Sequence, residues 1–390
     1  MARNLLRFVP GPLRPAAVAT AVRVLEFKHR PRIAPRQQKR LGKLPRTIVA
    51  GLFAERSGLT RGAELMLHDL QQKNADVIAV DVTQAIGHQP LRKAAAALLP
   101  HQLEGGAFDI VIHVNPPNFA RALNAFPIEV LDQSRLIGFW AWELERTPQT
   151  WSRAAAYCDE IWAPSPFVVD AIGRSIDFAG PVRCVPHAVN ADPFLPATPA
   201  QRESARRKLG LPADCFVMGY SFGIRSNYTR KNPMGSVRAF QRAFPSDSDA
   251  QLLLRYSDDL GLFPPAQDEL RTAVAGDPRI RLLSPEQLEI AELYAAIDVY
   301  LSLHRSEGYG LPLAEAAQAG RNVIATAWGL APDIAARPLV APVRFSMTPV
   351  RDPQGAYSKM RDCHWAEPDI DEAAGKLIAL KAHSRSKIGN

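Results

Sequence analysis

The feature that most constrains the fold is a repeated alternation of short apolar segments with segments of helical periodicity. In the first half of the chain, six apolar segments fit buried strands: 46–53, 77–82, 108–114, 135–142, 160–165 and 182–189. In the second half, strands are expected at 215–222, 250–257, 279–284, 299–304 and 322–328. Short apolar strands separated by helices are typical of a parallel sheet covered on both faces. The sequence therefore predicts an α/β protein with two Rossmann-like domains.

A stretch rich in Pro, Ala and charged residues at 191–213 separates the two series, and we place the hinge there. We predict an N-terminal domain at 47–195 and a C-terminal domain at 196–365, followed by a helix and tail at 366–390 that could pack back on the N-terminal domain. Ligands of open parallel sheets bind beyond the carboxyl ends of the strands. Two such domains would therefore face each other across a ligand-binding cleft.

The first 46 residues form a basic arm that the strand pattern does not include. They contain twelve Lys or Arg and one acidic residue, Glu26, which gives the arm a net charge of +11. The remaining residues carry −3, so the net charge of the whole chain is +8. A near-neutral body argues against a nucleic-acid partner. Apolar residues between 17 and 25 have helical spacing, and a basic amphipathic helix can bind an anionic membrane surface. A disordered or loosely packed extension and a mitochondrial-type targeting peptide stay open as alternatives.

The cysteines and the hydropathy of the sequence limit the cellular compartments in which we expect the protein. The four cysteines lie far apart without a C-x-x-C pair, which argues against a disulfide framework or a zinc site and favours a reducing compartment. The sequence has no run of 18 apolar residues that would span a membrane as a helix. We therefore expect a cytoplasmic protein, and peripheral attachment to the inner face of the membrane stays open.

The strongest candidate site is the segment HRSEGYGLPLAEAAQAG at 304–320, between an expected strand and an expected helix. Its glycines would let backbone N–H groups approach a ligand, and the positive end of the helix favours an anion such as a diphosphate. Two carboxylates eight positions apart, Glu307 and Glu315, can accept hydrogen bonds from vicinal hydroxyls, as on a ribose or a hexose. The donor-binding candidates are Gly308, Tyr309, Gly310, Leu311 and Glu315.

A second candidate is the basic loop IRSNYTRKNP at 224–233, which follows the first strand of the second domain. Two of its cations, Arg225 and Lys231, could neutralise the charge on a departing diphosphate, and Arg230 competes with Arg225 for that role. The sequence offers no Asp-x-Asp loop that would hold a metal. We predict no metal and no cofactor.

Several motifs, in order, resemble one known family. Glu307 and Glu315 match the E-x7-E pattern of retaining GT-B glycosyltransferases, and SEGYGLPLAEA resembles glycosyltransferase family 4. The segments GFWAWELE, EIWAPSPFVVDAI, VPHAVN, RKNP and WAEPD resemble signatures of a bacterial branch of that family. The resemblance covers about residues 47–380 and implies a GT-B fold with a nucleotide-sugar donor and retained anomeric configuration.

The resemblance also implies residue roles. Lys231 and Arg225 would contact the donor phosphates, Glu307 the donor sugar, and Glu315 the ribose. Gly58, in the turn after the first strand, corresponds to a glycine that approaches the donor phosphate or the acceptor. His113 ends a predicted strand, where it could bond a sugar hydroxyl or shuttle a proton, or could be a core histidine.

Together these expectations describe a metal-independent hexosyltransferase. It would move a hexose from a nucleotide-diphosphate sugar to an acceptor hydroxyl, on a glycan or lipid-linked glycan of cell-envelope or exopolysaccharide synthesis. Two alternatives stay open. One is a catalytically inactive GT-B scaffold, and the other is a sugar-nucleotide epimerase, which the E-x7-E turn and the RKNP loop fit poorly.

Overall fold

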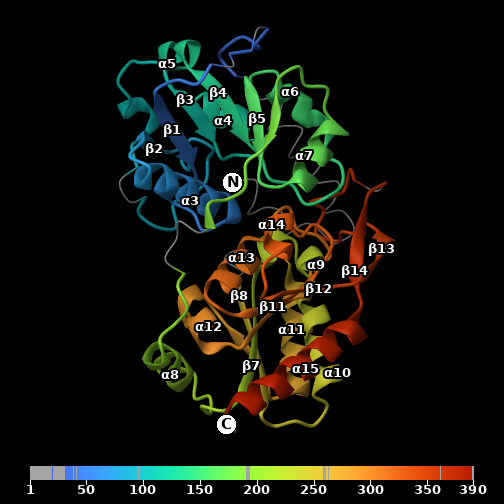
Figure 1. The fold of residues 1–390 in the computed structure, drawn as a ribbon. Helices are drawn as coiled ribbons and strands as arrows, with labels where there is room; N and C mark the ends of the chain where they lie inside the picture. The colour runs from blue at the N-terminus through green and yellow to red at the C-terminus, as the bar shows by residue number, and fades with distance from the viewer. Residues whose placement is uncertain are drawn as a thin grey trace. The chain divides into compact units, whose positions relative to one another are not determined.

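The computed structural model describes residue 20 and residues 31–388, with gaps at 38, 41, 95–96, 117, 190–193, 258–260, 262 and 361. It divides into two compact units, whose described parts end at residue 189 and begin at Phe194 (Figure 1). Each unit contains a six-stranded parallel sheet with a doubly wound strand order. This confirms the predicted α/β architecture of two Rossmann-like sheets.

The N-terminal unit has the strand order β2-β1-β3-β4-β5-β6, and all five neighbouring pairs are parallel. The strands are β1 (Arg46–Gly51), β2 (Asp76–Asp81), β3 (Asp109–Ile112), β4 (Arg135–Phe139), β5 (Glu160–Ala163) and β6 (Val182–Cys184). The helices are α3 (Gly58–Gln72), α4 (Phe119–Leu123), α5 (Ile128–Gln133), α6 (Ser152–Ala155) and α7 (Pro166–Gly173), with 3-10 turns η3 (Pro100–Gln102) and η4 (Gln149–Trp151). Each strand lies within or next to a segment predicted from apolar content.

Both faces of this sheet are buried, as its apolar strands require. Ile48 and Ala50 join one hydrophobic cluster, whereas Val49, between them, joins another. Alternate residues of a strand point to opposite faces. Apolar residues at all three positions therefore indicate a strand packed on both sides, which is why the sequence pattern was informative here.

The described part of the basic arm is not an appendage of the N-terminal unit but packs against it. Its basic side chains donate hydrogen bonds to backbone carbonyls at or just beyond the ends of α4, α5 and α6: Arg32 to Asn124 and Phe126, Arg36 to Leu131 and Ser134, Lys39 to Cys158, and Arg40 to Ser134. The carbonyl end of a helix carries partial negative charge, which favours cations. Residues 31–46, which we call the strap, therefore correct the predicted boundary at 46. The helix predicted at 17–25 lies outside the described residues except for Thr20.

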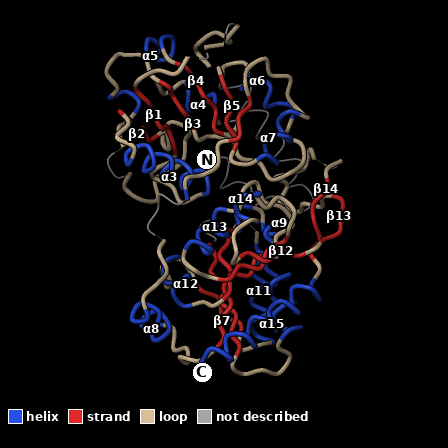
Figure 2. Tube along the Cα trace, in the orientation of Figure 1, coloured by secondary structure: helices blue, strands red, loops and turns tan. Residues whose placement is uncertain are grey.

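The C-terminal unit has the strand order β12-β11-β10-β7-β8-β9, again all parallel. Its strands are β7 (Phe216–Gly223), β8 (Ala250–Ser257), β9 (Ile280–Leu283), β10 (Val299–Ser302), β11 (Asn322–Thr326) and β12 (Val340–Val343), and β13 (Phe345–Pro349) and β14 (His364–Pro368) form a separate antiparallel pair. Its helices are α8 (Pro199–Lys208), α9 (Tyr228–Lys231), α10 (Pro233–Ala243), α11 (Pro264–Gly276), α12 (Ile290–Ala296), α13 (Leu311–Gln318), α14 (Pro332–Ala335) and α15 (Ile370–Ile388), with the 3-10 turn η6 (Ile224–Ser226). Figure 2 shows the strands in the middle of this unit with helices on both sides.

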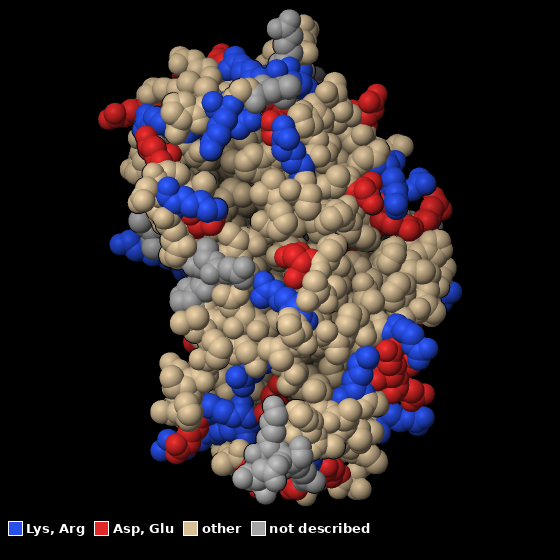
Figure 3. Space-filling model, in the orientation of Figure 1, with Lys and Arg blue, Asp and Glu red and all other residues tan. Residues whose placement is uncertain are grey.

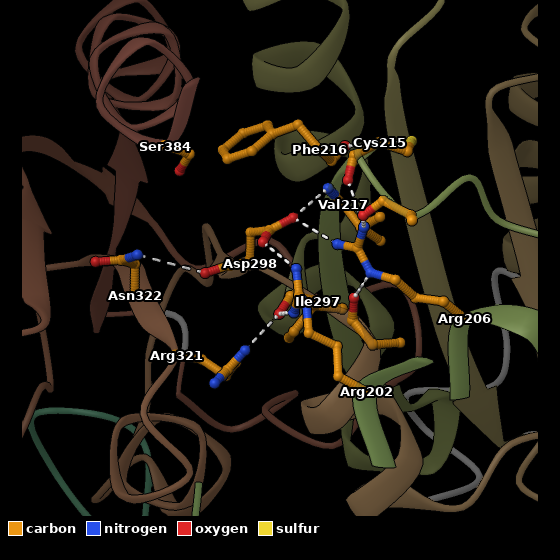
Figure 4. A network of polar contacts seen from close by, with 12 residues as sticks. Arg202, Arg206, Cys215, Phe216, Val217, Ile297, Asp298, Arg321, Asn322 and Ser384 are labelled. Atoms are coloured by element: carbon orange, nitrogen blue, oxygen red, sulfur yellow. Dashed lines mark hydrogen bonds and ion pairs between the residues drawn. The ribbon is translucent and has the colours of Figure 1, made fainter. Parts of the chain in front are cut away.

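An ionic network fastens α8, at the start of this unit, to the sheet (Figure 4). Asp298, just before β10, accepts hydrogen bonds from the guanidinium groups of Arg202 and Arg206 and from the backbone N–H of Val217. The Arg206 side chain is 4% exposed. Because a buried charge is stable only with partners, this network holds α8 firmly against the sheet, within the stretch where the sequence placed the hinge.

The last helix, α15, packs against α10 and β12 of the C-terminal unit. Lys381 on α15 pairs with Asp247, which follows α10, and Arg242 on α10 pairs with Asp371 on α15. These contacts attach the C-terminal helix to the C-terminal unit, and the expectation that it could also pack on the N-terminal domain stays a prediction. An apolar face of α15, including Ala373 and Leu377, is buried in its own unit.

Surface charge agrees with a near-neutral body. On the face drawn in Figure 3, Lys and Arg are interspersed with Asp and Glu. Among the described residues, no helix is long and apolar enough to cross a bilayer.

Candidate active site

The segment 304–320 forms the strand–turn–helix unit that the sequence predicted. β10 ends at Ser302, Glu307 lies in the turn, and α13 begins at Leu311. Gly310 is the N-cap with φ 101°, a left-handed conformation that glycine adopts without strain. Pro312 lies in the first turn of α13, where its missing N–H is no loss.

The basic loop forms a one-turn helix, α9, held between two asparagines. Asn227 (φ 72°) caps its N-terminus, and Asn232 (φ 47°) ends it and caps the next helix, α10. Both are buried, and their amides donate hydrogen bonds to Asp352 Oδ1 (2.7 Å) and to the Leu303 carbonyl (2.7 Å). Asparagine tolerates left-handed backbone better than other non-glycine residues. The two asparagines therefore fix the position of Lys231, the last residue of α9.

Lys231 and Glu307, 76 positions apart in the sequence, form an ion pair through Lys231 Nζ and Glu307 Oε1. Both side chains are 13% exposed. Arg230 Nη1 lies 3.4 Å from the other carboxylate oxygen and donates a 2.7 Å hydrogen bond to the Ser306 carbonyl. Burial alone would raise the pKa of Glu307, but the cations Lys231 and Arg230 outweigh it and hold the pKa at about 2. Glu307 is therefore ionised at neutral pH and can only accept hydrogen bonds.

A buried histidine, His304, lies next to the turn that contains Glu307 and helps to hold it in place. His304 is fully buried, and its ring nitrogens lie 3.1 Å from Ser302 Oγ and 3.2 Å from the Trp328 carbonyl. Burial lowers its pKa to about 4, which keeps the ring neutral at pH 7. A neutral ring has one N–H, which the Trp328 carbonyl can accept, leaving the other nitrogen for the serine hydroxyl. His304 thereby links β10 to the turn after β11.

The turn after β11, which contains Gly329, packs directly against the backbone of Glu307. Gly329 has φ 72°, and a Cβ added there would lie 2.9 Å from the Glu307 backbone nitrogen and closer still to its carbonyl oxygen. Tyr309 donates a 2.7 Å hydrogen bond to Asp333 on α14. Leu311 and Tyr309 are 9% and 4% exposed, which indicates that they pack the turn. The 329–334 segment thus forms the back wall of the Glu307 turn.

Glu315 lies one turn inside α13 and is 5% exposed. Its carboxylate accepts a 3.1 Å hydrogen bond from the Tyr294 hydroxyl on α12. Burial and the nearby Glu315 carboxylate raise the pKa of Tyr294 well above its ordinary value, so Tyr294 stays a hydrogen-bond donor. This bond uses one position on Glu315 and orients the carboxylate.

The structure separates the two cations that the sequence proposed for the phosphates. Arg225 lies in η6 and is exposed, whereas Lys231 lies beside Glu307. Arg230, the named competitor, is 2% exposed and touches Glu307. The adjacent residues Arg230 and Lys231 of α9 therefore both reach the Glu307 carboxylate, whereas Arg225 lies on the preceding turn η6 with its side chain exposed. Spacing along the chain could not show which cations lie inward.

His113 and Gly58 belong to the N-terminal unit. His113 is fully buried, stacks on Phe139 with ring centroids 4.2 Å apart, and its Nε2 lies 3.4 Å from Met66 Sδ. Burial, with a smaller contribution from His187, lowers its pKa well below the ordinary value. The structure thus gives His113 a buried, neutral ring stacked on Phe139, and its role at a sugar hydroxyl or in proton transfer stays a prediction.

Gly58 is the first residue of α3, and a Cβ added there would meet no atom within 4 Å. A Cβ at Gly62, further along the same helix, would lie 2.5 Å from the His187 ring, so the close packing in this region is at Gly62. The role at a donor or acceptor that the resemblance implied for Gly58 stays a prediction.

The candidate site contains no metal-binding cluster within the described part of the chain, where no group of three or more His, Cys, Asp and Glu side chains could hold an ion. Its polar groups are instead two carboxylates, two inward cations and the N-terminus of α13. This set can accept hydrogen bonds from hydroxyls and attract a diphosphate.

Known proteins resemble this chain in part of its sequence and in its fold. Residues 238–362 match the family model described as glycosyl transferases group 1. A glycosyltransferase from Rickettsia africae superposes with TM-score 0.54 at 15% identity, covering 88% of this chain and 97% of that one. HepE of Anabaena, solved in complex with UDP and glucose, gives TM-score 0.54 at 14% identity, covering 88% and 95%. The chain has the GT-B fold. Sucrose-phosphate synthase from Thermosynechococcus elongatus shares this GT-B likeness, with TM-score 0.52 at 15% identity and coverage of 88% and 98%.

The segment that matches the family model contains only some of the residues of the candidate site. It begins at residue 238 and ends at 362, so it includes both glutamates but not Lys231. No curated protein matches the sequence. Within the GT-B fold, the sequence reasoning missed two supporting residues, His304 and Gly329. The HRSEG wording next to Glu307 was a signal for His304, and Gly329 had none, because its role depends on contact with Glu307.

Proposed function

We propose that the chain is a retaining, metal-independent hexosyltransferase that uses a nucleotide-diphosphate sugar. The observation that carries the proposal is the Lys231–Glu307–Arg230 cluster beside the N-terminus of α13, built on a GT-B fold with a group 1 glycosyltransferase segment. HepE, of similar fold, was solved with UDP and glucose, which supports a nucleotide-sugar donor here.

Each group in the cluster has a role in this proposal. Glu315, oriented by Tyr294, accepts hydrogen bonds from the ribose hydroxyls. Glu307, ionised with its pKa near 2, accepts hydrogen bonds from hydroxyls of the donor sugar. Lys231 and the backbone N–H groups of the Gly308–Gly310 turn stabilise the leaving diphosphate. Arg225, exposed on the same loop, assists at the phosphate from the solvent side.

In the proposed reaction the bond between the anomeric carbon and the diphosphate oxygen breaks, and a bond to the acceptor oxygen forms on the same face. The electron pair of the broken bond stays on the diphosphate, which also takes the acceptor proton. The sugar is oxocarbenium-like at the transition state. Lys231 acts where negative charge develops, and groups of this kind typically contribute about 10²–10³ in rate.

The acceptor is proposed to be a glycan or lipid-linked glycan of cell-envelope or exopolysaccharide synthesis, reached at the inner face of the membrane. In this proposal the membrane contact lies in the residues before the strap, because the side chains of Arg32, Arg36 and Lys39 already donate hydrogen bonds within the protein. Residues 1–30 contain six further Lys or Arg. Removing residues 1–30 should weaken binding to anionic liposomes and leave turnover with a soluble acceptor intact; unchanged binding would end the membrane proposal.

A thermal-shift panel of nucleoside diphosphates and their sugars tests the donor. A ligand at 100 times its dissociation constant adds about 2.7 kcal/mol of stability. We expect a shift with one base, and slow donor hydrolysis without acceptor. Glu307→Gln should retain the fold and abolish transfer. Absence of any shift and of hydrolysis would instead favour an inactive scaffold.

A further inference from the structure

The antiparallel pair β13–β14 and the loop 350–360 lie outside the parallel sheet and have no part in the chemistry described above. Figure 1 shows β13 and β14 next to α9. The pair joins Phe345–Pro349 to His364–Pro368, and its second strand contains the first four residues of the WAEPD motif. We call β13, β14 and the loop 350–360 the brace.

The loop of the brace contacts the N-terminal side of α9. Asp352 accepts the 2.7 Å hydrogen bond from the Asn227 amide, which holds the left-handed residue that caps α9. Gln354 accepts a hydrogen bond from the backbone N–H of Tyr228 and donates one of 3.0 Å to the Ile224 carbonyl. One side chain of the brace therefore bonds to backbone groups on both sides of the η6–α9 junction.

The strand β14 contacts α9 through Arg305. Glu367 on β14 accepts a 2.7 Å hydrogen bond from Arg305 Nε, and Arg305 Nη1 donates one of 2.7 Å to the Thr229 carbonyl. The backbone of Arg305 also joins both sides, since its N–H bonds the Arg230 carbonyl and its C=O accepts from Ala366. The brace thus continues across Arg305 into the helix that ends at Lys231.

We propose that the brace sets the position of Lys231 on the donor diphosphate, with Gln354 as a positioning residue. The proposal rests on the proposed function, since it assigns a task within that site. α9 has four residues, too few to be stable alone. Its position must come from outside contacts, and the brace supplies the ones on its N-terminal side.

The test compares UDP with UMP, which lacks the β-phosphate, by calorimetric titration of the full chain. GDP with GMP and ADP with AMP are run in parallel, and the pair that the wild type binds is used. The preference for diphosphate over monophosphate reports the phosphate cations rather than the base pocket. Gln354→Met removes both hydrogen bonds at similar side-chain length. Lys359→Ala, an exposed residue of the same loop, is the matched control.

Gln354→Met should lower the preference for diphosphate by about 3- to 10-fold, the usual size for one or two lost hydrogen bonds. Lys359→Ala should leave it within about 2-fold of the wild type. In a Lys231→Ala background the Gln354→Met effect should vanish, because a positioning residue acts only through the group it positions. Asp352→Ala should reproduce the loss if Gln354→Met fails to fold.

Other outcomes separate the two proposals. If the wild type binds no nucleoside diphosphate, the proposed function fails. If it prefers diphosphate and Gln354→Met keeps that preference, the brace has no such role and the proposed function stands. Equal weakening of both nucleotides, or an effect that persists without Lys231, would show that Gln354 merely stabilises the fold and would overturn the positioning role.

Discussion

Replacing Gly329 by Ala tests whether the wall behind Glu307 positions that residue. The added Cβ would lie 2.9 Å from the Glu307 nitrogen and nearer still to its carbonyl oxygen, inside the 3.0 Å that real Cβ atoms keep. Both partners are backbone atoms, so no flexible side chain can turn away. One of the two turns has to move.

The expected magnitude has two parts. Alanine at φ 72° costs about 1–2 kcal/mol of stability, because left-handed backbone is unfavourable for a residue with a Cβ. The clash adds a displacement of the Glu307 turn on the order of 1 Å, which can lower a catalysed rate by about 10²-fold. Transfer should therefore fall far more than stability does.

Gly320→Ala is the matched control. Gly320 has φ 73°, and a Cβ there would meet Pro196 at 3.4 Å, an ordinary contact. The control therefore carries the backbone strain without the clash. Both variants should melt earlier than the wild type by similar amounts, and only Gly329→Ala should lose transfer in initial-rate assays with saturating nucleotide sugar. Wild-type turnover by a folded Gly329→Ala enzyme would refute the reasoning that this contact places Glu307.

Four further predictions concern charge and packing. Lys231→Ala should lower transfer by about 10²–10³-fold in initial-rate assays, and it should also lower the melting midpoint, because it leaves the largely buried Glu307 carboxylate without its nearest cation. A 2-fold effect on transfer by a folded variant would remove Lys231 from the site. Because the pKa of Glu307 is lowered from 4.5 to about 2, its ionised form contributes stability that is complete above about pH 4.5 and is lost as the pH falls through 2. Urea unfolding should show this loss of stability at acid pH in the wild type and not in Glu307→Gln. The same loss in both proteins would contradict the prediction. Asp298→Asn should lower the unfolding free energy by about 3 kcal/mol, since it leaves the buried guanidinium group of Arg206 without its carboxylate, whereas Asp371→Ala, in a pair more than two-thirds exposed, should lower it by less than about 0.5 kcal/mol. Arg36→Ala should lower it by about 1–3 kcal/mol, and no change would show that the strap is dispensable.

The sequence predicted the parts of the fold that repeat a local pattern. The apolar strands and the turn at Glu307 follow from residues within a few positions of each other, and the structure confirms both. The resemblance assigned Lys231 and Glu307 to one donor site, but the ion pair between them was not predicted, since 76 residues separate them.

Features that depend on distant contacts could not be predicted. The strap looked like an appended cationic arm because a charge count does not show which carbonyls Arg36 and Lys39 reach. Similarly, the close packing at Gly62 depends on His187. β12, β13 and β14 were missed, because their segments of four or five residues include exposed or half-buried positions and lack the apolar run that marked the other strands.

The strap also has a consequence for how the chain folds during its synthesis. The hydrogen bonds that the side chains of Arg32, Arg36, Lys39 and Arg40 donate join residues 92 to 119 positions apart, such as Arg32 to Asn124 and Lys39 to Cys158. At about 5–20 residues per second, a ribosome takes on the order of 10 s to make the chain between them. During that interval the cationic segment is complete but its partners do not yet exist. The N-terminal unit therefore closes late, when the residues beyond Cys158 emerge, and the strap, although made before every strand of the unit, is among the last segments to pack.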